Sequence, residues 1–342
     1  MSILNQIAEK YNKVAIIGMA KNAGKTTTLN YLIDEAFNEN ISLGVTSTGR
    51  DGEGIDLVTG TDKPRVYLEA GTIVSVPVQL HELSDAGLEI LSMTRYFTAL
   101  GQILLCRVVE GGYVQIAGPA NTSDHKSMCV EMMDLGAELI LIDGAVDRKS
   151  IADPTVSDAI VLATGAVISR SLKRIVEETT HVVSLYRLPL LNADDVRKRI
   201  VEDMASGNVR LFKKDAEINL DLATGLMAGK VLDKAIDKDT DWVYIPGALT
   251  HGVISDINPA KLKKTTFILK DPTRIFIGPT HWKQLCRKGL RVKVLENIEI
   301  AAITVNPYSP LGYSFDHEEL LDAMKRAMNG IPVMDVRYSP GR

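Results

Sequence analysis

The clearest chemical signal in the chain is a loop bounded by two glycines. It reads Gly18-Met19-Ala20-Lys21-Asn22-Ala23-Gly24-Lys25-Thr26, which fits the pattern G-x-x-x-x-G-K-T. Glycines at the two ends allow backbone conformations that a side chain would forbid, so successive N–H groups can converge on phosphate oxygens. The pattern therefore predicts a phosphate-binding loop that leads into the start of a helix, where the helix dipole also favours an anion.

Two residues of this pattern have distinct expected roles. Lys25 is expected to contact the β- and γ-phosphates of a nucleotide, and the hydroxyl of Thr26 to hold Mg²⁺. The predicted phosphate-binding residues are Gly18, Lys21, Asn22, Ala23, Gly24, Lys25, Thr26 and Thr27. A glycine-rich turn with a solvated lysine is the alternative. The apolar run at 14–17 before the loop and the amphipathic stretch after it favour the phosphate site, because strand–loop–helix is its expected context.

Two acids are candidates for holding the metal. Asp143 follows the apolar run at 138–142 and precedes a glycine, which indicates a Walker B strand whose acid binds Mg²⁺ directly or through water. Asp51 lies in Gly49–Glu53, after a strand that ends near Ser47, and is expected to touch the metal or orient the attacking water. Solvated Asp-Gly turns are the alternative at both places. The predicted catalytic residues are Lys25, Asp51 and Asp143, and the predicted metal ligands are Thr26, Asp51 and Asp143.

These residues need a sheet to position them, and the sequence predicts one. Short β-branched runs alternate with amphipathic stretches, a pattern typical of an α/β fold with a mainly parallel sheet. The expected strands of the first half are 13–17, 42–47, 103–108, 113–117, 138–142 and 159–163, and the expected helices are 25–38, 85–100, 123–135 and 169–178. A turn at Glu110–Gly112 predicts a hairpin and hence one antiparallel edge.

The length of 342 residues predicts about two domains. We expect a P-loop nucleotide-binding domain over 1–187, a bridging helix and linker over 188–221, and a second, smaller α/β domain over 222–342. The bridging helix is expected at 193–204. The expected strands of the second domain are 242–245, 265–269, 298–305 and 332–336, and its helices are 222–236, 249–256, 280–288 and 316–328.

The second domain carries no motif, but two of its residues allow chemistry. His251 and Asp271 each follow an expected strand, and they would form an acid–base pair if the two strands are neighbours. Solvated polar residues in turn-forming loops are the alternative.

The composition excludes several classes of protein. The formal net charge is −4, which gives no electrostatic footprint for nucleic acid or an anionic membrane. The three cysteines, Cys106, Cys129 and Cys286, are far apart and form no CxxC pair, which fits a reducing cytoplasm. No apolar run approaches the roughly 20 residues of a membrane span. We therefore expect a cytoplasmic protein.

The GKTT loop, the early acid and the strand ending in Asp-Gly resemble the P-loop NTPases of the dethiobiotin synthetase, MinD and metallochaperone class. Met19 stands where MinD-type members carry a signature lysine. No N/T-K-x-D guanine motif follows Ala163, where the chain reads Thr164-Gly165-Ala166. This favours ATP over GTP as the nucleotide, with GTP as the alternative.

More narrowly, the chain is similar to the P-loop component of the reactivating factor associated with cobalamin-dependent lysine 5,6-aminomutase. The similarity lies in its length, in the GKTTT loop, in Leu141–Arg148 and in Val305–Tyr308. It implies nucleotide-driven release of damaged cobalamin, with aminomutase subunits and a MutS-like ATPase as protein partners. An ATP-dependent ligase or kinase for a small molecule and a nucleotide-gated binding protein without hydrolysis are the alternatives. The oligomeric state stays open.

Overall fold

The computed structural model describes residues 3–48, 66–119, 121–144, 156–214, 216–220, 222 and 228–337. The chain divides into two compact units by the contacts within it. The first unit comprises Met1–Val176 and Glu299–Arg342, and the second comprises Glu177–Ile298. In sequence, the second unit is therefore an insertion between two segments of the first.

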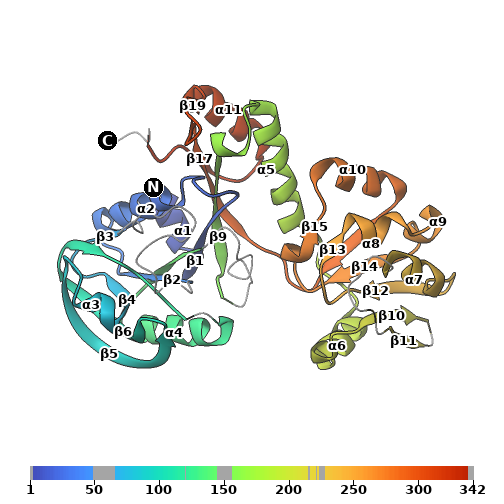
Figure 1. Cartoon of the computed structure of the whole chain (residues 1–342), viewed down its shortest axis with the longest axis horizontal. Coiled ribbons are helices and arrows are strands. Elements are labelled where there is room, and N and C mark those ends of the chain that lie inside the picture. The colour runs from blue at the N-terminus through green and yellow to red at the C-terminus, as the bar shows by residue number, and fades with distance from the viewer. Residues whose placement is uncertain are drawn as a thin grey trace. The chain divides into compact units, whose positions relative to one another are not determined.

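The first unit is built on a nine-stranded sheet with helices on both sides (Figure 1). The neighbouring strands from β20 to β4 all run parallel, and β6 and β5 are added antiparallel at one edge. The order is β20 (Val333–Met334), β17 (Ile300–Asn306), β9 (Ala159–Gly165), β1 (Lys13–Gly18), β8 (Leu139–Asp143), β2 (Leu43–Ser47), β4 (Ile73–Pro77), β6 (Gly101–Glu110) and β5 (Gly87–Thr98). The predicted α/β fold with a mainly parallel sheet is confirmed.

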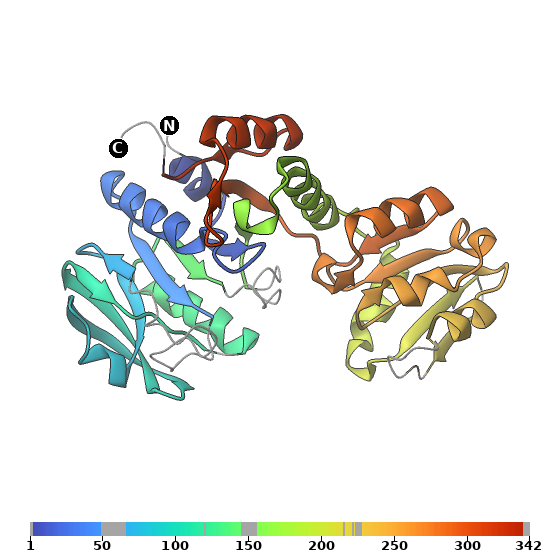
Figure 2. The same ribbon diagram turned by 45° about the horizontal axis from the view of Figure 1, so that its top comes forward.

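The central strands are apolar throughout because both faces of the sheet are covered. Every residue of β9 is buried, and β1 and β8 each have one partly exposed end residue. Helices α1 (Ile3–Ala8) and α2 (Lys25–Asn38) share one core cluster with β1, β2 and β4. Helix α4 (Thr122–Asp134) lies on the opposite side of the sheet from α2 (Figures 1 and 2).

Smaller elements complete the first unit. Strands β3 and β7 form one antiparallel pair and β18 and β19 another. The chain enters the second unit within α5. These elements are α3 (Val78–His81), β3 (Val66–Leu68), β7 (Gly112–Val114), α5 (Leu172–Tyr186), β18 (Tyr308–Ser309), β19 (Tyr313–Ser314) and α11 (His317–Ala327).

The second unit has a five-stranded mixed sheet of its own. Strands β12, β14 and β16 run parallel, and β10 is antiparallel to both of its neighbours. The order is β11 (Glu217–Leu220), β10 (Val209–Lys213), β12 (Thr240–Tyr244), β14 (Thr266–Leu269) and β16 (Arg291–Val294). The other elements are α6 (Asp194–Glu202), α7 (Ala228–Ala235), β13 (Leu249–Thr250), α8 (His251–Ser255), α9 (Pro259–Leu262), β15 (Ile275–Phe276) and α10 (Pro279–Lys288).

The predicted domain boundaries differ from this division. The strands expected at 298–305 and 332–336 exist as β17 and β20, but they pair within the sheet of the first unit. The helix expected at 193–204 exists as α6 and belongs to the second unit. The prediction of one second domain over 222–342 is therefore corrected: burial of β17 against β9 places the end of the chain in the first unit.

The predicted helix at 85–100 is wrong, because this stretch forms the edge strand β5. Its pairing with β6 shifts register between Gly87 and Leu88, between Ile90 and Ser92, and between Met93 and Phe97. These bulges break the two-residue alternation that marks a strand in sequence. The hairpin predicted at Glu110–Gly112 is also absent, because β7 pairs with β3. The antiparallel edge comes from β6 and β5.

Candidate functional site

The carboxyl ends of neighbouring parallel strands meet at one edge of the first unit's sheet. Asp143 at the end of β8 is in register with Ile16 of β1 and with Ser47 of β2. The chain leaves β1 toward β2 on one side and leaves β8 toward β9 on the other, so the strand order reverses between them. In open α/β sheets such a switch point is where ligands bind.

The glycine loop (residues 18–24) joins β1 to α2 at this point. The Met19 N–H donates to the Ala163 carbonyl at 2.9 Å, which ties the loop to the end of β9. Asn22 and Gly24 have φ values of 63° and 104°, and Gly24 is the residue from which α2 begins. The left-handed backbone at Gly24 lets the chain turn directly into the helix, so the N–H groups of its first turn are left without partners in the helix. Lys21 is exposed.

The side chain of Lys25 turns back over the end of β1. Its ammonium donates a hydrogen bond to the carbonyl of Gly144, the residue after Asp143. Its stem passes Gly18 so closely that a Cβ added there would lie 3.0 Å from Lys25 Cγ. Glycine at position 18 therefore makes room for the lysine. The structure thus brings the ammonium of Lys25, in the first turn of α2, to the residue that follows half-buried Asp143 at the end of β8.

The three threonines after Lys25 differ in their surroundings. Thr26 is half-buried in the first turn of α2. Thr27 lines a cleft beside the glycine loop. Thr28 is fully buried, and its hydroxyl lies 2.8 Å from the hydroxyl of Thr304 in β17. Thr28 therefore joins α2 to β17, so its hydroxyl is already engaged within the protein, unlike the half-exposed threonines Thr26 and Thr27.

Asn306 is a site residue that the sequence reasoning placed in the wrong domain. It ends β17, and its amide Nδ2 donates to the carbonyl of Asn22 at 3.4 Å. Its Cβ would lie 3.2 Å from a Cβ added at Gly24. The cleft beside the loop is lined by Ala23, Gly24, Thr27, Thr28, Thr304, Val305, Asn306, Val336 and Arg337. The signal that could have found Asn306 is its place after a buried β-branched strand, the same context that marks Asp143.

The cleft also receives an arginine from the end of the described chain. The Arg337 guanidinium lies 5.1 Å from the centre of the Tyr308 ring, which is within the range of a cation–π contact. The Arg337 N–H donates to Asp335 Oδ1 at 3.0 Å. Arg337 therefore adds a positive charge to the lining of the cleft.

A buried histidine lies near the end of β2. His125 of α4 is almost fully buried, and burial lowers its pKa to about 4, although the Ser47 carbonyl acts in the opposite direction. Its Nδ1 lies 3.6 Å from Sγ of Cys129. His125 is therefore neutral at ordinary pH. No spacing of histidines in the sequence marks this residue.

Three more of the predicted residues are Asp51, His251 and Asp271. Asp51, with the rest of Gly49–Glu53, lies outside the described residues. His251 stacks on His281 with ring centres 4.3 Å apart. Asp271 caps a turn by accepting from the Thr273 N–H at 2.9 Å, and it contacts Arg274 Nε at 3.4 Å. The two residues have different partners, so the expected acid–base pair does not form.

Comparison of the chain with protein-family models, with curated proteins and with solved structures gives no significant match. In the described part of the chain, no group of three or more His, Cys, Asp or Glu side chains could hold a metal by itself. No helix among these residues is both long and apolar enough to span a membrane. Function is therefore inferred from the geometry of the site.

Proposed function

We propose that the glycine loop binds the phosphates of a nucleoside triphosphate together with Mg²⁺. One observation carries this proposal: left-handed Gly24 starts α2 at the switch point of the sheet, and Lys25 in the first turn of α2 contacts Gly144, the residue after Asp143. Helix N-terminal N–H groups and a lysine together favour a polyanion over neutral ligands. ATP is the proposed nucleotide because the guanine motif is missing after Ala163.

Lys25, Thr26 and Asp143 have different proposed roles at this site. Lys25 exchanges the Gly144 carbonyl for phosphate oxygens and neutralises part of their charge. Thr26 and Asp143 would hold Mg²⁺ through a hydroxyl and a carboxylate, both of which suit a hard cation. When bound, Mg²⁺ would supply positive charge that offsets the charge developing on the phosphate oxygens. Asp51 keeps its proposed role beside the metal or the attacking water.

We further propose that ATP hydrolysis acts on protein partners, namely the subunits of a cobalamin-dependent aminomutase and a MutS-like ATPase, in the cytoplasm. The similarity of the loop and of Val305–Tyr308 to the reactivating factor supports this proposal. An ATP-dependent ligase or kinase is the second candidate. It is favoured by the separate sheet of the second unit, whose three parallel strands offer carboxyl ends for a small substrate.

The test is calorimetric titration of ATP with Mg²⁺ into the wild-type protein and into Lys25→Met and Lys10→Met. Lys10 is an exposed lysine of the same unit outside the loop, so Lys10→Met is the matched control. We expect Lys25→Met to abolish measurable binding and Lys10→Met to retain it. In a parallel melt, ATP at 100 times its Kd should stabilise the wild type by about 2.7 kcal/mol. Equal binding by both variants would contradict the site.

Measurement of ATP hydrolysis distinguishes the partner-directed role from the ligase or kinase. Turnover that rises when an aminomutase is added, with no small substrate present, supports the partner-directed role. Turnover that needs a small acceptor supports the ligase or kinase. Tight binding without phosphate release under either condition would contradict both and leave a nucleotide-gated binding protein.

A further inference from the structure

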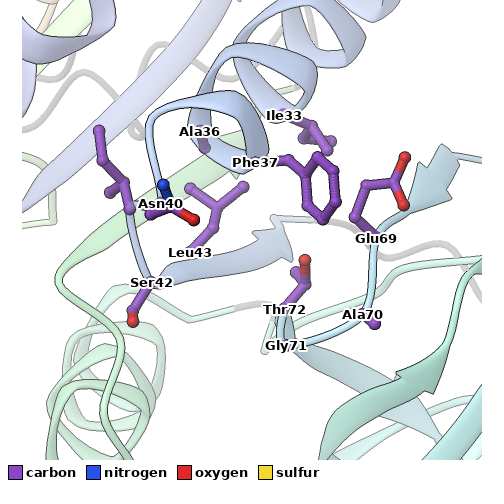
Figure 3. Close-up of a pocket in the computed structure, with 11 residues that line it drawn as sticks. Ile33, Ala36, Phe37, Asn40, Ser42, Leu43, Glu69, Ala70, Gly71 and Thr72 are labelled. Carbon is purple, nitrogen blue, oxygen red and sulfur yellow. The ribbon is translucent and has the colours of Figure 1, made fainter.

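A second cavity lies at the other end of α2. It has a volume of about 220 Å³ and is formed by the last turns of α2, the start of β2 and the turn before β4 (Figure 3). Helix α2 has 14 residues, so at 1.5 Å per residue its two ends are about 21 Å apart. This cavity, the amine pocket, is lined by residues 33, 36, 37, 40–43 and 69–72. It is separate from the glycine loop and independent of the proposed function.

The walls of the amine pocket are mainly apolar. Ile33, Ala36 and Leu43 are buried and form its inner side. Phe37 stands at the rim, with 53% of its surface exposed and its ring beside the pocket (Figure 3). Large apolar side chains on α2 otherwise face the core, so an exposed phenylalanine ring here is free to contact a ligand.

One charged group reaches the pocket. The Glu69 side chain lies next to the Phe37 ring in Figure 3. Among the described residues, its carboxylate forms no ion pair or hydrogen bond, although its backbone carbonyl accepts from the Thr72 N–H at 3.2 Å. A carboxylate beside an exposed aromatic face attracts a cation by charge and by the negative face of the ring.

Polar atoms complete the lining. The side chains of Thr72 and Asn40 also line the pocket (Figure 3). Asn40 lies just after the end of α2 and has a left-handed φ of 54°, and its N–H donates to the Phe37 carbonyl at 3.2 Å. Glycine is the usual residue at such a position, so asparagine adds an amide to the pocket that the turn does not need.

We propose that the amine pocket binds an aliphatic primary ammonium group. Its ligand places the ammonium between Glu69 and Phe37 and its alkyl stem against Ile33, Ala36 and Leu43. The volume equals about seven waters at roughly 30 Å³ each, which fits a stem of four to six carbons. An anion is disfavoured by Glu69, and a larger ligand by the volume. A free alkylamine and a lysine side chain share this chemistry.

The test uses n-pentylammonium as the probe and follows amide chemical shifts of the ¹⁵N-labelled full chain. We expect saturable shifts at Asn40, Gly71 and Thr72, with none from 1-pentanol at the same concentration. Glu69→Gln should weaken binding about fivefold, the value of one exposed ion pair. Phe37→Leu should weaken it about threefold through loss of the ring face.

The control variant is Glu39→Gln, which removes an exposed acid next to Asn40 but outside the lining. It should bind n-pentylammonium like the wild type. Asn40→Gly should bind more weakly while leaving the turn intact. Equal binding of 1-pentanol, or no loss in Glu69→Gln, would overturn the proposal.

A second probe separates the two sources of the amine. Lysine blocked at both its amino and carboxyl groups presents only the side-chain ammonium. Binding as tight as that of n-pentylammonium assigns the pocket to a lysine side chain of another protein. Binding of n-pentylammonium alone assigns it to a free amine. Failure of both probes would refute the proposal without affecting the nucleotide site, which the Lys25 variants test.

Discussion

Replacing Gly24 by alanine should lower the free energy of unfolding of the first unit by more than the backbone strain of an alanine at this position. Gly24 has a φ of 104°, and an alanine in a left-handed conformation costs about 1–2 kcal/mol. The added Cβ would also lie 3.2 Å from the Cβ of Asn306. Asn306 cannot move aside easily, because β17 pairs with a strand on each side. We expect this contact to add about 1 kcal/mol, the low end of the range for overpacking.

Gly136 offers a matched control, because its φ of 109° is similar and a Cβ there meets nothing within 4 Å. Gly136→Ala should therefore show the strain alone, and Gly24→Ala should exceed it by about 1 kcal/mol. At about 2–4 °C per kcal/mol for a domain of this size, the extra loss is a few degrees in Tm. Adding Asn306→Gly should recover it, whereas Asn306→Ala keeps the offending Cβ and should not.

The assay can distinguish the two units because both tryptophans, Trp242 and Trp282, belong to the second unit. Tryptophan fluorescence reports unfolding of that unit, and far-ultraviolet circular dichroism reports both. Gly24→Ala should lower the midpoint of the circular dichroism transition and leave the fluorescence midpoint in place. A loss no larger than that of Gly136→Ala would refute the reasoning about Asn306.

Three further predictions concern single side chains. Asp143→Asn should retain ATP binding but weaken its dependence on Mg²⁺, which an unchanged Mg²⁺ titration would contradict. The pKa of His125 is about 4 in the folded protein and near 6.5 in the unfolded chain. The unfolded chain therefore takes up a proton first, so the contribution of His125 to stability is present above pH 6.5 and is lost as the pH falls toward 4. This loss amounts to about 3 kcal/mol, and His125→Gln should remove it from the pH dependence of urea unfolding. Burial raises the pKa of Cys106 to about 11 and of Cys129 to about 12. At pH 8 a thiol reagent should therefore label exposed Cys286 first, and rapid labelling of all three cysteines would contradict the packing.

Local sequence signals were sufficient for the core of the candidate site. The helix from Lys25 to Asn38 and the strands that end at Gly18 and Asp143 lie where the pattern of apolar residues and glycines predicted them. Their neighbourhood could be inferred because the carboxyl ends of parallel strands share one edge of the sheet. The contact of Lys25 with Gly144 follows from that shared edge.

Long-range pairing was beyond the reach of the same signals. The apolar run at 298–305 predicts a strand, but nothing local shows that Ile300 pairs with Ile160, across the whole inserted unit. For this reason the sequence predicts both the domain boundary and the domain of Asn306 wrongly. The error at β5 has a different cause, because its bulges hide the two-residue period on which strand prediction depends.

The second unit is inserted between two strands of the first unit that border the glycine loop. It is entered after β9 by way of α5, and it is left at Glu299, immediately before β17. These two strands are neighbours, and a Cβ on Gly165 at the end of β9 would fall 2.0 Å from the Asn306 carbonyl oxygen. The backbones of β9 and β17 are thus in tight contact at the strand ends that border the glycine loop, where Asn306 touches Gly24. A nucleotide at the proposed site would therefore bind beside the two strands, β9 and β17, that the chain of the second unit connects.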